Sequence, residues 1–275
     1  MAKPKLTNAA KPATFEVEAY NERGEMVPTS IAGEHPLTLY LDKREIVTLM
    51  TLGHAPEALA IGYLRNQRLA ESISDIAAVQ VDWETESVAV TTHSKKPLPA
   101  LDRKTVTTGC GQGTVFGDLM EEIDSIELRR DVRLTDADLF VLLEKVRKHE
   151  TIYKQAGAVH GCALATTSGE ILMFVEDVGR HNAVDAIAGF MWLDAIDGAD
   201  KVFYTTGRLT SEMVIKCAQM RIPFLVSRSG LTQMGHAIAQ KVGITMLGRA
   251  SGRHYLAFTG KERLVRTTPQ PTALA

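Results

Sequence analysis

The chain has 275 residues, of which 45% are hydrophobic and 23% are charged, and these proportions are typical of a globular protein with about two domains. The net charge of −2 argues against a general nucleic-acid or anionic-membrane binder, since either would carry a basic excess. No apolar run approaches the ~20 residues that span a bilayer, the N-terminal segment lacks the apolar core of a secretory signal, and the three scattered cysteines suit a reducing cytoplasm.

The first half of the chain is predicted to be mainly β with a few helices. Residues 1–14 are rich in Lys, Pro and Ala and are expected to form a disordered tail. Alternating apolar residues then predict a strand over 15–19 and a hairpin over 37–50, and Pro56 marks the start of a helix. A second strand pair is expected over 79–83 and 88–92, so residues 15–133 form an N-terminal β-rich domain that carries Cys110.

Strands and helices alternate from residue 134 onward, which predicts a layered α/β domain over 134–262 and a tail over 263–275. Thr135 and Asp138 have the spacing of a capping box before a helix with one apolar face. Further helices are expected to open near Ser211 and Thr232. Strands are predicted over residues 171–175, 202–206, 223–226, 244–247 and 255–258.

The stretch from Gly157 to Asp185 is the centre of this organisation. The apolar run 171–175 is the pattern of a strand buried on both faces, and it leads into the charged turn 176–182. Asn182 followed by Asp185 predicts a helix N-cap with a reciprocal partner. Such a turn indicates either a ligand site at a strand end or simply a well-capped helix with surface charges.

Polar loops follow several strands of the second half, and in an alternating α/β sheet they converge on one edge. Arginines and hydroxyls there would suit a phosphate-bearing ligand, because Arg binds phosphate bidentately. Taken singly, each loop is equally typical of a solvated turn. The candidate binding residues are Arg180, His181, Arg208, Ser227, Arg228 and the run Arg249, Ala250, Ser251, Gly252, Arg253 and His254.

Cys110 lies in a glycine-rich loop, Gly109-Cys110-Gly111-Gln112-Gly113, which leaves a thiol accessible as a nucleophile or sulfur carrier. A lone cysteine in a turn is also commonly inert. Cys162 and Cys217 lie on apolar segments and are predicted to be small buried side chains. Motifs for a P-loop, a zincin, a zinc deaminase or a hydrolase elbow are missing from the sequence, and the dispersed cysteines argue against zinc.

Eight segments in order resemble the formate dehydrogenase accessory sulfurtransferase family (FdhD), over roughly residues 34 to 260. The most specific are EDVGRHNAVD and TTGRLTSEMV. The others are EHPLTLYLD, LMTLGHAPEALAIGYL, TTGCGQG, GAVHGCALA, PFLVSRSG and GITMLGRASGRHYLAFT.

This resemblance implies a C-terminal cytidine-deaminase-like three-layer α/β domain lacking zinc, an N-terminal β-rich α+β domain, a homodimer and a cytoplasmic location. It implies a sulfurtransferase that takes persulfide sulfur from a cysteine desulfurase. The sulfur passes to the molybdenum of bis(molybdopterin guanine dinucleotide), before that cofactor enters the formate dehydrogenase catalytic subunit. The persulfide cysteine of the family falls on Cys110, and its cofactor-binding loop falls on Arg249 to His254.

The sequence departs from the family pattern at Gly113, where the family typically has the second cysteine of a C-x-x-C pair. One thiolate is still sufficient for sulfur exchange. The missing cysteine keeps open a second hypothesis, a chaperone that binds and delivers the molybdenum cofactor without transferring sulfur. A cysteine hydrolase is a weaker alternative, because the sequence places no histidine beside Cys110.

Overall fold

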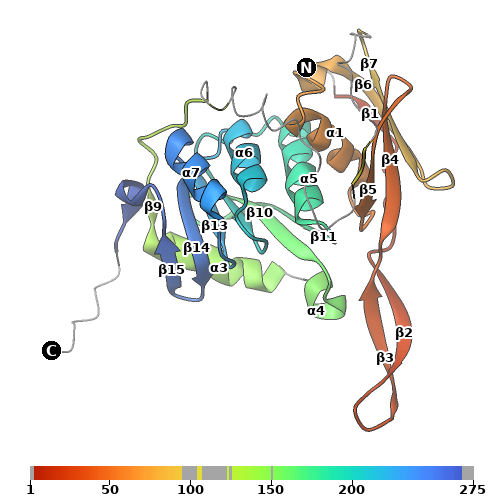
Figure 1. The fold of residues 1–275 in the computed structure, drawn as a ribbon, viewed down its shortest axis with the longest axis horizontal. Coiled ribbons are helices and arrows are strands. Elements are labelled where there is room, and N and C mark those ends of the chain that lie inside the picture. Colours follow the sequence, from red (N-terminus) through yellow and green to blue (C-terminus); the bar gives the residue numbers. More distant parts are fainter. Residues whose placement is uncertain (1–2, 95–103, 107–122, 124–125, 150, 268–275) are drawn as a thin grey trace. The chain divides into compact units, whose positions relative to one another are not determined.

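The computed structural model describes residues 3–94, 104–106, 123, 126–149 and 151–267 (Figure 1). The chain divides into two compact units that are each built from separate stretches of sequence. The first unit comprises residues 1–119, 150–162 and 175–196, and the second comprises 120–149, 163–174 and 197–275. The predicted division into two contiguous domains at residue 133 is therefore wrong: the segments around 150–162 and 175–196, assigned to the second domain, belong to the first unit.

The first unit contains a six-stranded sheet with strand order β1-β6-β7-β4-β5-β8. Its strands are β1 (Lys5–Leu6), β4 (His35–Leu41), β5 (Arg44–Thr51), β6 (Ile76–Asp82), β7 (Ser87–Thr92) and β8 (Lys104–Val106). The predicted hairpin is confirmed as the antiparallel pair β4–β5, which turns at Asp42 and Lys43, both with positive φ. The second predicted strand pair is confirmed as β6–β7.

Residues 3–13 are ordered, contrary to the expected tail. β1 pairs in parallel with β6, and the indole Nε1 of Trp83 donates to the carbonyl oxygen of Ala9 at 2.6 Å. The backbone N–H of Ala9 donates to Glu57 Oε1 at 2.9 Å. The Lys- and Pro-rich composition concealed these contacts, because they use the backbone and a distant tryptophan rather than an apolar pattern in the segment itself.

A separate two-stranded ribbon in the first unit is formed by β2 (Thr14–Tyr20) and β3 (Met26–Ala32). The sequence predicted β2 but not β3, whose proline and weak alternation hide its strand character. A short helix, α4 (Ile152–Ala156), lies against this ribbon, and the side-chain amide of Gln155 donates to the hydroxyl of Ser30 at 3.5 Å.

Two helices of the first unit, α1 (Pro56–Asn66) and α5 (Arg180–Leu193), cross at unusually short distance. A Cβ atom built on Gly62 would lie 1.6 Å from the carbonyl oxygen of Asp185, and one on Gly189 would lie 1.9 Å from that of Ala58. Beside the crossing, the buried Asn66 amide donates to Asp185 Oδ1 at 2.6 Å. The two glycines therefore allow backbone contact between helices that no side chain could permit.

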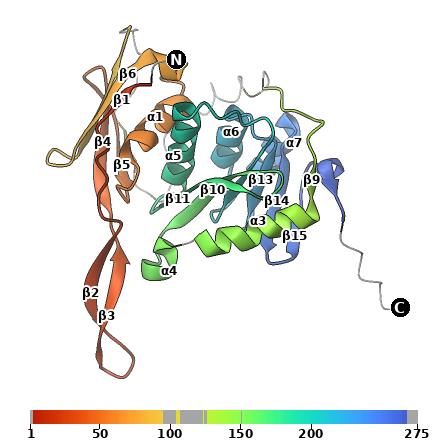
Figure 2. The same ribbon diagram turned by 180° about the vertical axis from the view of Figure 1, so that it is seen from behind.

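The second unit is a three-layer α/β structure. Its sheet has strand order β11-β10-β12-β13-β14-β15, and β12, β13 and β14 run parallel. Figures 1 and 2 show α3 on one face of these strands and α6 and α7 on the other. The elements are α3 (Asp136–His149), β10 (His160–Thr166), β11 (Ile171–Asp177), β12 (Lys201–Thr205), α6 (Ser211–Gln219), β13 (Phe224–Ser227), α7 (Gln233–Val242), β14 (Thr245–Ser251) and β15 (His254–Ala257). Residues 160–162 of β10 and 175–177 of β11 are assigned to the first unit.

The predicted α/β alternation is confirmed, and so are the helix signals at Thr135, Thr232 and Gly243. The Thr135 hydroxyl accepts from the backbone N–H of Asp138 at 3.0 Å, and the apolar face of α3 is buried against the sheet. Thr232 caps α7 by accepting from the N–H of Gly235 at 3.1 Å, and Gly243 ends the helix in the left-handed region.

Two predictions about strand ends are corrected. β11 is an edge strand with Leu172 exposed, so the run 171–175 is not buried on both faces. The predicted tail over 263–275 begins with structure, since β16 (Leu264–Val265) pairs in parallel with β9 (Leu134–Thr135) and Arg263 is buried. The sequence also favours a helix over residues 115–126, and that segment lies almost entirely outside the described residues. No helix among the described residues is long and apolar enough to cross a membrane.

We predict that Gly62→Ala lowers the free energy of unfolding by about 3 kcal/mol or more, because the added methyl forces the backbones of α1 and α5 apart. Gly230→Ala is the matched control, since nothing lies within 4 Å of its added Cβ. It should change stability by no more than ~0.5 kcal/mol. Urea denaturation of both variants measures the difference, and equal midpoints would disprove the close crossing.

Candidate functional site

The carboxyl ends of β12, β13 and β14 meet at one edge of the second unit's sheet, because the three strands are parallel. Their loops are joined directly. The Ser227 hydroxyl donates to the carbonyl oxygen of Gly207 at 2.7 Å, and the N–H of Leu209 donates to the carbonyl oxygen of Gly230 at 3.0 Å. The N–H of Arg249 donates to the Ser229 carbonyl at 2.9 Å. The predicted convergence is thus confirmed for these three loops (residues 206–210, 227–232 and 248–254), which we call the strand-end loops, and not for the turn that carries Arg180 and His181, which belongs to the first unit.

Three arginines of the strand-end loops have exposed side chains, namely Arg208, Arg249 and Arg253. None of the three forms a side-chain hydrogen bond or ion pair with another described residue. Arg228 is half-buried, and Ser251, Gly252 and His254 are exposed in the turn between β14 and β15. Guanidinium groups that are not neutralised by carboxylates can bind an anionic ligand bidentately.

Two of the predicted binding residues have side chains that are occupied within the protein. Ser227 is fully buried and its hydroxyl ties its own loop to Gly207. Ala250 is buried in the core that α3 shares with the sheet. Their side chains hold the loops in place, so any ligand contact from these positions would come from neighbouring residues or the backbone.

The end of β14 and the turn after it have backbone conformations that are uncommon for residues other than glycine. Arg249 and Gly252 both have positive φ, and the register with β15 shifts between Gly248 and Ser251. A Cβ on Gly248 would lie 2.9 Å from the ring of Phe258. Side chains at the end of β14 alternate between the two faces of the strand, so Arg249 is exposed while Ala250 is buried in the core.

The strand-end loops also lead into two helix N-termini, where unbonded N–H groups favour an anion. Thr210 precedes α6 without capping it through its side chain, and its buried hydroxyl has no hydrogen-bond partner among the described residues. Thr232 does cap α7. The sequence assigned the cap of α6 to Ser211, one residue too late, and it did not mark Thr210.

A second polar centre lies in the first unit around the buried carboxylate of Asp177. Oδ2 accepts from the Thr51 hydroxyl at 2.6 Å and from the N–H of Leu52 at 3.1 Å. Oδ1 accepts from the N–H of Gly179 and from the Asn182 amide, both at 2.9 Å. Burial raises the pKa of this carboxyl above its usual value, and the four donors act in the opposite sense.

This centre corrects the predicted helix start. The N-cap of α5 is Gly179 rather than Asn182. The amide of Asn182 instead donates to Asp177 and, at 2.7 Å, to the carbonyl oxygen of Met50. The carboxylate of Asp185 accepts a hydrogen bond from the amide of Asn66. The sequence could not reveal this, because the partners from β5 and α1 are more than a hundred residues away.

Arg180 and His181 open α5 and are both buried in the first unit. Glu176, which the sequence placed in an exposed charged turn, is also buried. Its carboxylate accepts from the N–H groups of Thr151, Ile152 and Tyr153 at 3.0–3.1 Å and from the Thr151 hydroxyl. The charged run 176–182 is therefore largely an internal bonding network.

Cys110 and Gly113 lie outside the described residues. Cys162 and Cys217 are fully buried free thiols, as predicted. Within the described part of the chain, no three His, Cys, Asp or Glu side chains are grouped so as to hold a metal ion.

The fold and the strand-end loops define a mixed α/β protein with exposed arginines at the carboxyl edge of a parallel sheet. Residues 32–265 match the model of the FdhD/NarQ family, and the chain belongs to that family. The resemblance found in the sequence is therefore confirmed.

Individual relatives extend this similarity over nearly the whole chain. The chain is 28% identical to the sulfur carrier protein FdhD of Listeria innocua, over 94% of this chain and 99% of that protein. It is 30% identical to the protein of the same name from Wolinella succinogenes, over 84% of this chain and 81% of that protein. The crystal structure of a putative formate dehydrogenase accessory protein from Desulfotalea psychrophila is similar with a TM-score of 0.75 and 26% identity, covering 92% of this chain and all of that one.

We predict that Asp177→Asn destabilises the protein by about 1–3 kcal/mol, because an amide has only one acceptor oxygen and leaves two buried donors unsatisfied. Asp194→Asn is the control, since Asp194 forms only an exposed ion pair with Lys3. Thermal unfolding followed by circular dichroism compares them. Equal losses in the two variants would contradict the role given to Asp177.

Proposed function

We propose that this protein is a sulfur carrier that serves a formate dehydrogenase. Family membership over residues 32–265 is the observation that supports this most strongly, since the relatives named above are sulfur carrier proteins and a formate dehydrogenase accessory protein. Cys110 is the proposed persulfide cysteine. Its sulfur would come from a cysteine desulfurase, and its acceptor would be the molybdenum of bis(molybdopterin guanine dinucleotide), before the cofactor enters the catalytic subunit of formate dehydrogenase.

The chemistry at Cys110 is an exchange at sulfur. The Cys110 thiolate attacks the terminal sulfur of the donor's persulfide, a new S–S bond forms, and the donor's cysteine thiolate leaves. The terminal sulfur then passes to the acceptor, and the Cys110 thiolate is regenerated. Flanking glycines remove steric cover from the thiol.

The strand-end loops are the proposed cofactor platform. The molybdenum cofactor carries pyrophosphates, and the exposed guanidinium groups of Arg208, Arg249 and Arg253 provide the complementary charge. Arg228, Ser251 and His254 remain proposed contributors to this platform, and the ligand-binding role of Arg180 and His181, which lie in the first unit, stays a prediction from the sequence. We further propose a deaminase-like fold without zinc for the second unit, because its three layers fit that description. We also propose a cytoplasmic location and a homodimer.

The alternative function is a chaperone that delivers the cofactor without moving sulfur. Gly113 favours it, since the loop has no second cysteine for a relay. Under this alternative the strand-end loops keep their role and Cys110 has none.

We predict that incubation with a cysteine desulfurase and free cysteine adds one sulfur atom to the wild-type chain and none to Cys110→Ala. Cys162→Ala is the control and should still gain sulfur, because that thiol is fully buried. Intact-mass analysis before and after reduction reads the result. Failure of the wild type to gain sulfur, with cofactor binding intact, would favour the chaperone.

We predict that Arg249→Ala and Arg208→Ala each weaken binding of guanosine diphosphate, used as a fragment of the cofactor, by roughly tenfold or more, because each removes a charged hydrogen-bond donor. Arg221→Ala serves as the control, since Arg221 is exposed at the far end of α6. Isothermal titration calorimetry measures the affinities. Equal affinity in all three variants would place the nucleotide elsewhere.

A further inference from the structure

The β2–β3 ribbon of the first unit forms a two-stranded sheet of its own in the part of the chain that the structure describes. Figures 1 and 2 show the ribbon extending beyond the end of β4. Its strands pair without a break from Thr14 opposite Ala32 to Tyr20 opposite Met26, so each residue of β2 shares a face with its partner in β3. An isolated two-stranded ribbon is marginally stable in water, and one of its faces is therefore expected to pack against other protein.

The two faces of the ribbon differ in charge, because successive residues of a strand point to opposite sides. One face, which we call the uncharged face, consists of Phe15, Val17, Ala19, Val27, Thr29 and Ile31. The other face, which we call the acidic face, carries the exposed side chains of Glu16 and Glu18, opposite Ser30 and Pro28. The ribbon is therefore amphipathic, and only the uncharged face is suited to burial.

The described residues leave much of the uncharged face open to solvent. Ile31 is 48% exposed, Phe15 is 43% exposed, and Thr29 is exposed as well. The helix α4 reaches the ribbon, but the Gln155 amide donates to the hydroxyl of Ser30, which lies on the acidic face. Aromatic and β-branched side chains that line one side of two paired strands are typical of the inner face of a β-sandwich.

We propose that the uncharged face packs on the same face of a second copy of this chain across a two-fold axis, so that two ribbons form a four-stranded sandwich. A two-fold contact brings the same surface of both copies together, and charged residues at its centre would meet like charges. The uncharged face has no such residue, whereas the acidic face would bring Glu16 and Glu18 close to their own copies. The inference rests on the homodimer proposed above, whose surface it names, and not on the sulfur chemistry.

A second copy fits the uncharged face better than an unrelated protein does. An unrelated partner would need an uncharged strip of the same length and twist, and a second copy always has one. The ribbon is also held in shape by its own turn, where Asn21 Oδ1 accepts from the N–H groups of Arg23 at 2.9 Å and Glu25 at 3.0 Å. An ordered ribbon loses little conformational freedom when it packs. A different protein is the competing occupant.

The test compares the full-length wild type with Thr29→Glu/Ile31→Glu by sedimentation equilibrium over a series of concentrations. Both side chains are exposed in the single chain, so the variant should fold. Its dimer would place four carboxylates in an otherwise uncharged contact. We expect the wild type to dimerise and the variant to dimerise with a dissociation constant about tenfold or more higher, because like charges then face each other.

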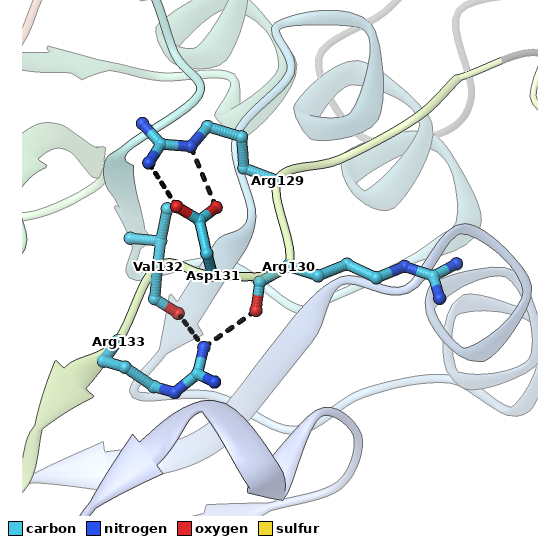
Figure 3. A network of polar contacts seen from close by, with 5 residues as sticks. All are labelled: Arg129, Arg130, Asp131, Val132 and Arg133. Carbon is cyan, nitrogen blue, oxygen red and sulfur yellow. Dashed lines mark hydrogen bonds and ion pairs between the residues drawn. The ribbon is translucent and has the colours of Figure 1, made fainter.

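Two control variants change the net charge by the same amount. Tyr20→Glu/Met26→Glu adds two carboxylates to the acidic face, where both side chains are exposed. Arg130→Glu alters the second unit, and Figure 3 shows the Arg130 side chain extending away from the bonded groups of its own segment. Both controls should dimerise as the wild type does. Circular dichroism verifies that all variants are folded.

A variant of opposite charge tests the pairing of the two faces directly. Thr29→Lys/Ile31→Lys should also dimerise weakly on its own. An equimolar mixture with Thr29→Glu/Ile31→Glu should form heterodimers, since opposite charges then meet across the contact. Misfolding of either variant could not produce this rescue.

The inference is overturned if the wild type is monomeric, if Thr29→Glu/Ile31→Glu dimerises unchanged, or if the mixture forms no heterodimer. It is also overturned if the variants lose binding to a different protein while their dimer persists. Sulfur loading of Cys110 is measured in parallel by intact mass. Loading without this dimer would contradict the inference alone, whereas the dimer without loading would support the inference and contradict the proposed function.

Discussion

The close crossing of α1 and α5 is the constraint on which the first unit depends. Backbone touches backbone at Gly62 and Gly189, so the separation of the two helices is fixed by atoms that cannot rotate away. Side-chain contacts beside the crossing fix the position of one helix along the other. The Asn66 amide donates to Asp185, and the Arg65 guanidinium donates to the carbonyl oxygen of Ala188 at 2.8 Å and lies over the ring of Trp192. Burial lowers the pKa of Arg65 to about 10, so it remains a cation at neutral pH. A fixed α5 in turn fixes the Asp177 centre at its start, where β5 and the helix share one carboxylate.

The second unit achieves the same rigidity by different means. Its strand-end loops bind each other through backbone carbonyls and the buried Ser227 hydroxyl. Gly252 adopts the positive φ of the turn after β14, and Gly248, within β14, leaves room for the ring of Phe258. Because the loops are held from within, the outward-pointing arginines need no carboxylate to position them. In the proposed cofactor platform their charges would therefore be free for the ligand, and loops that are already ordered would lower the cost of binding it.

Local patterns in the sequence were sufficient to predict most of the helices and strands, but not the burial and hydrogen-bond partners of their side chains. Thr135 and Asp138, Thr232, Gly243 and the β4–β5 turn act within a few residues, and all were predicted. Asn182 was misassigned because its partners, Asp177 and Met50, belong to strands whose proximity only the tertiary fold creates. Likewise, arginines that look alike in sequence differ in the structure: Arg249 is exposed, whereas Arg263 is buried and supports the backbone. The position of these arginines after predicted strands therefore identified the strand-end loops, but it could not show which arginines are exposed.

The burial of two of the three cysteines restricts what the proposed sulfur chemistry can be. In a C-x-x-C loop a second thiolate can attack the persulfide-bearing cysteine, which forms a disulfide and releases the sulfur as sulfide. Gly113 removes that thiol, and Cys162 and Cys217 cannot replace it within the folded chain because both are fully buried. In the proposed mechanism, a persulfide on Cys110 would therefore have no second accessible cysteine in its own chain to discharge it prematurely. Its sulfur would leave to an external acceptor, so the binding of cofactor and partner would set the timing of transfer.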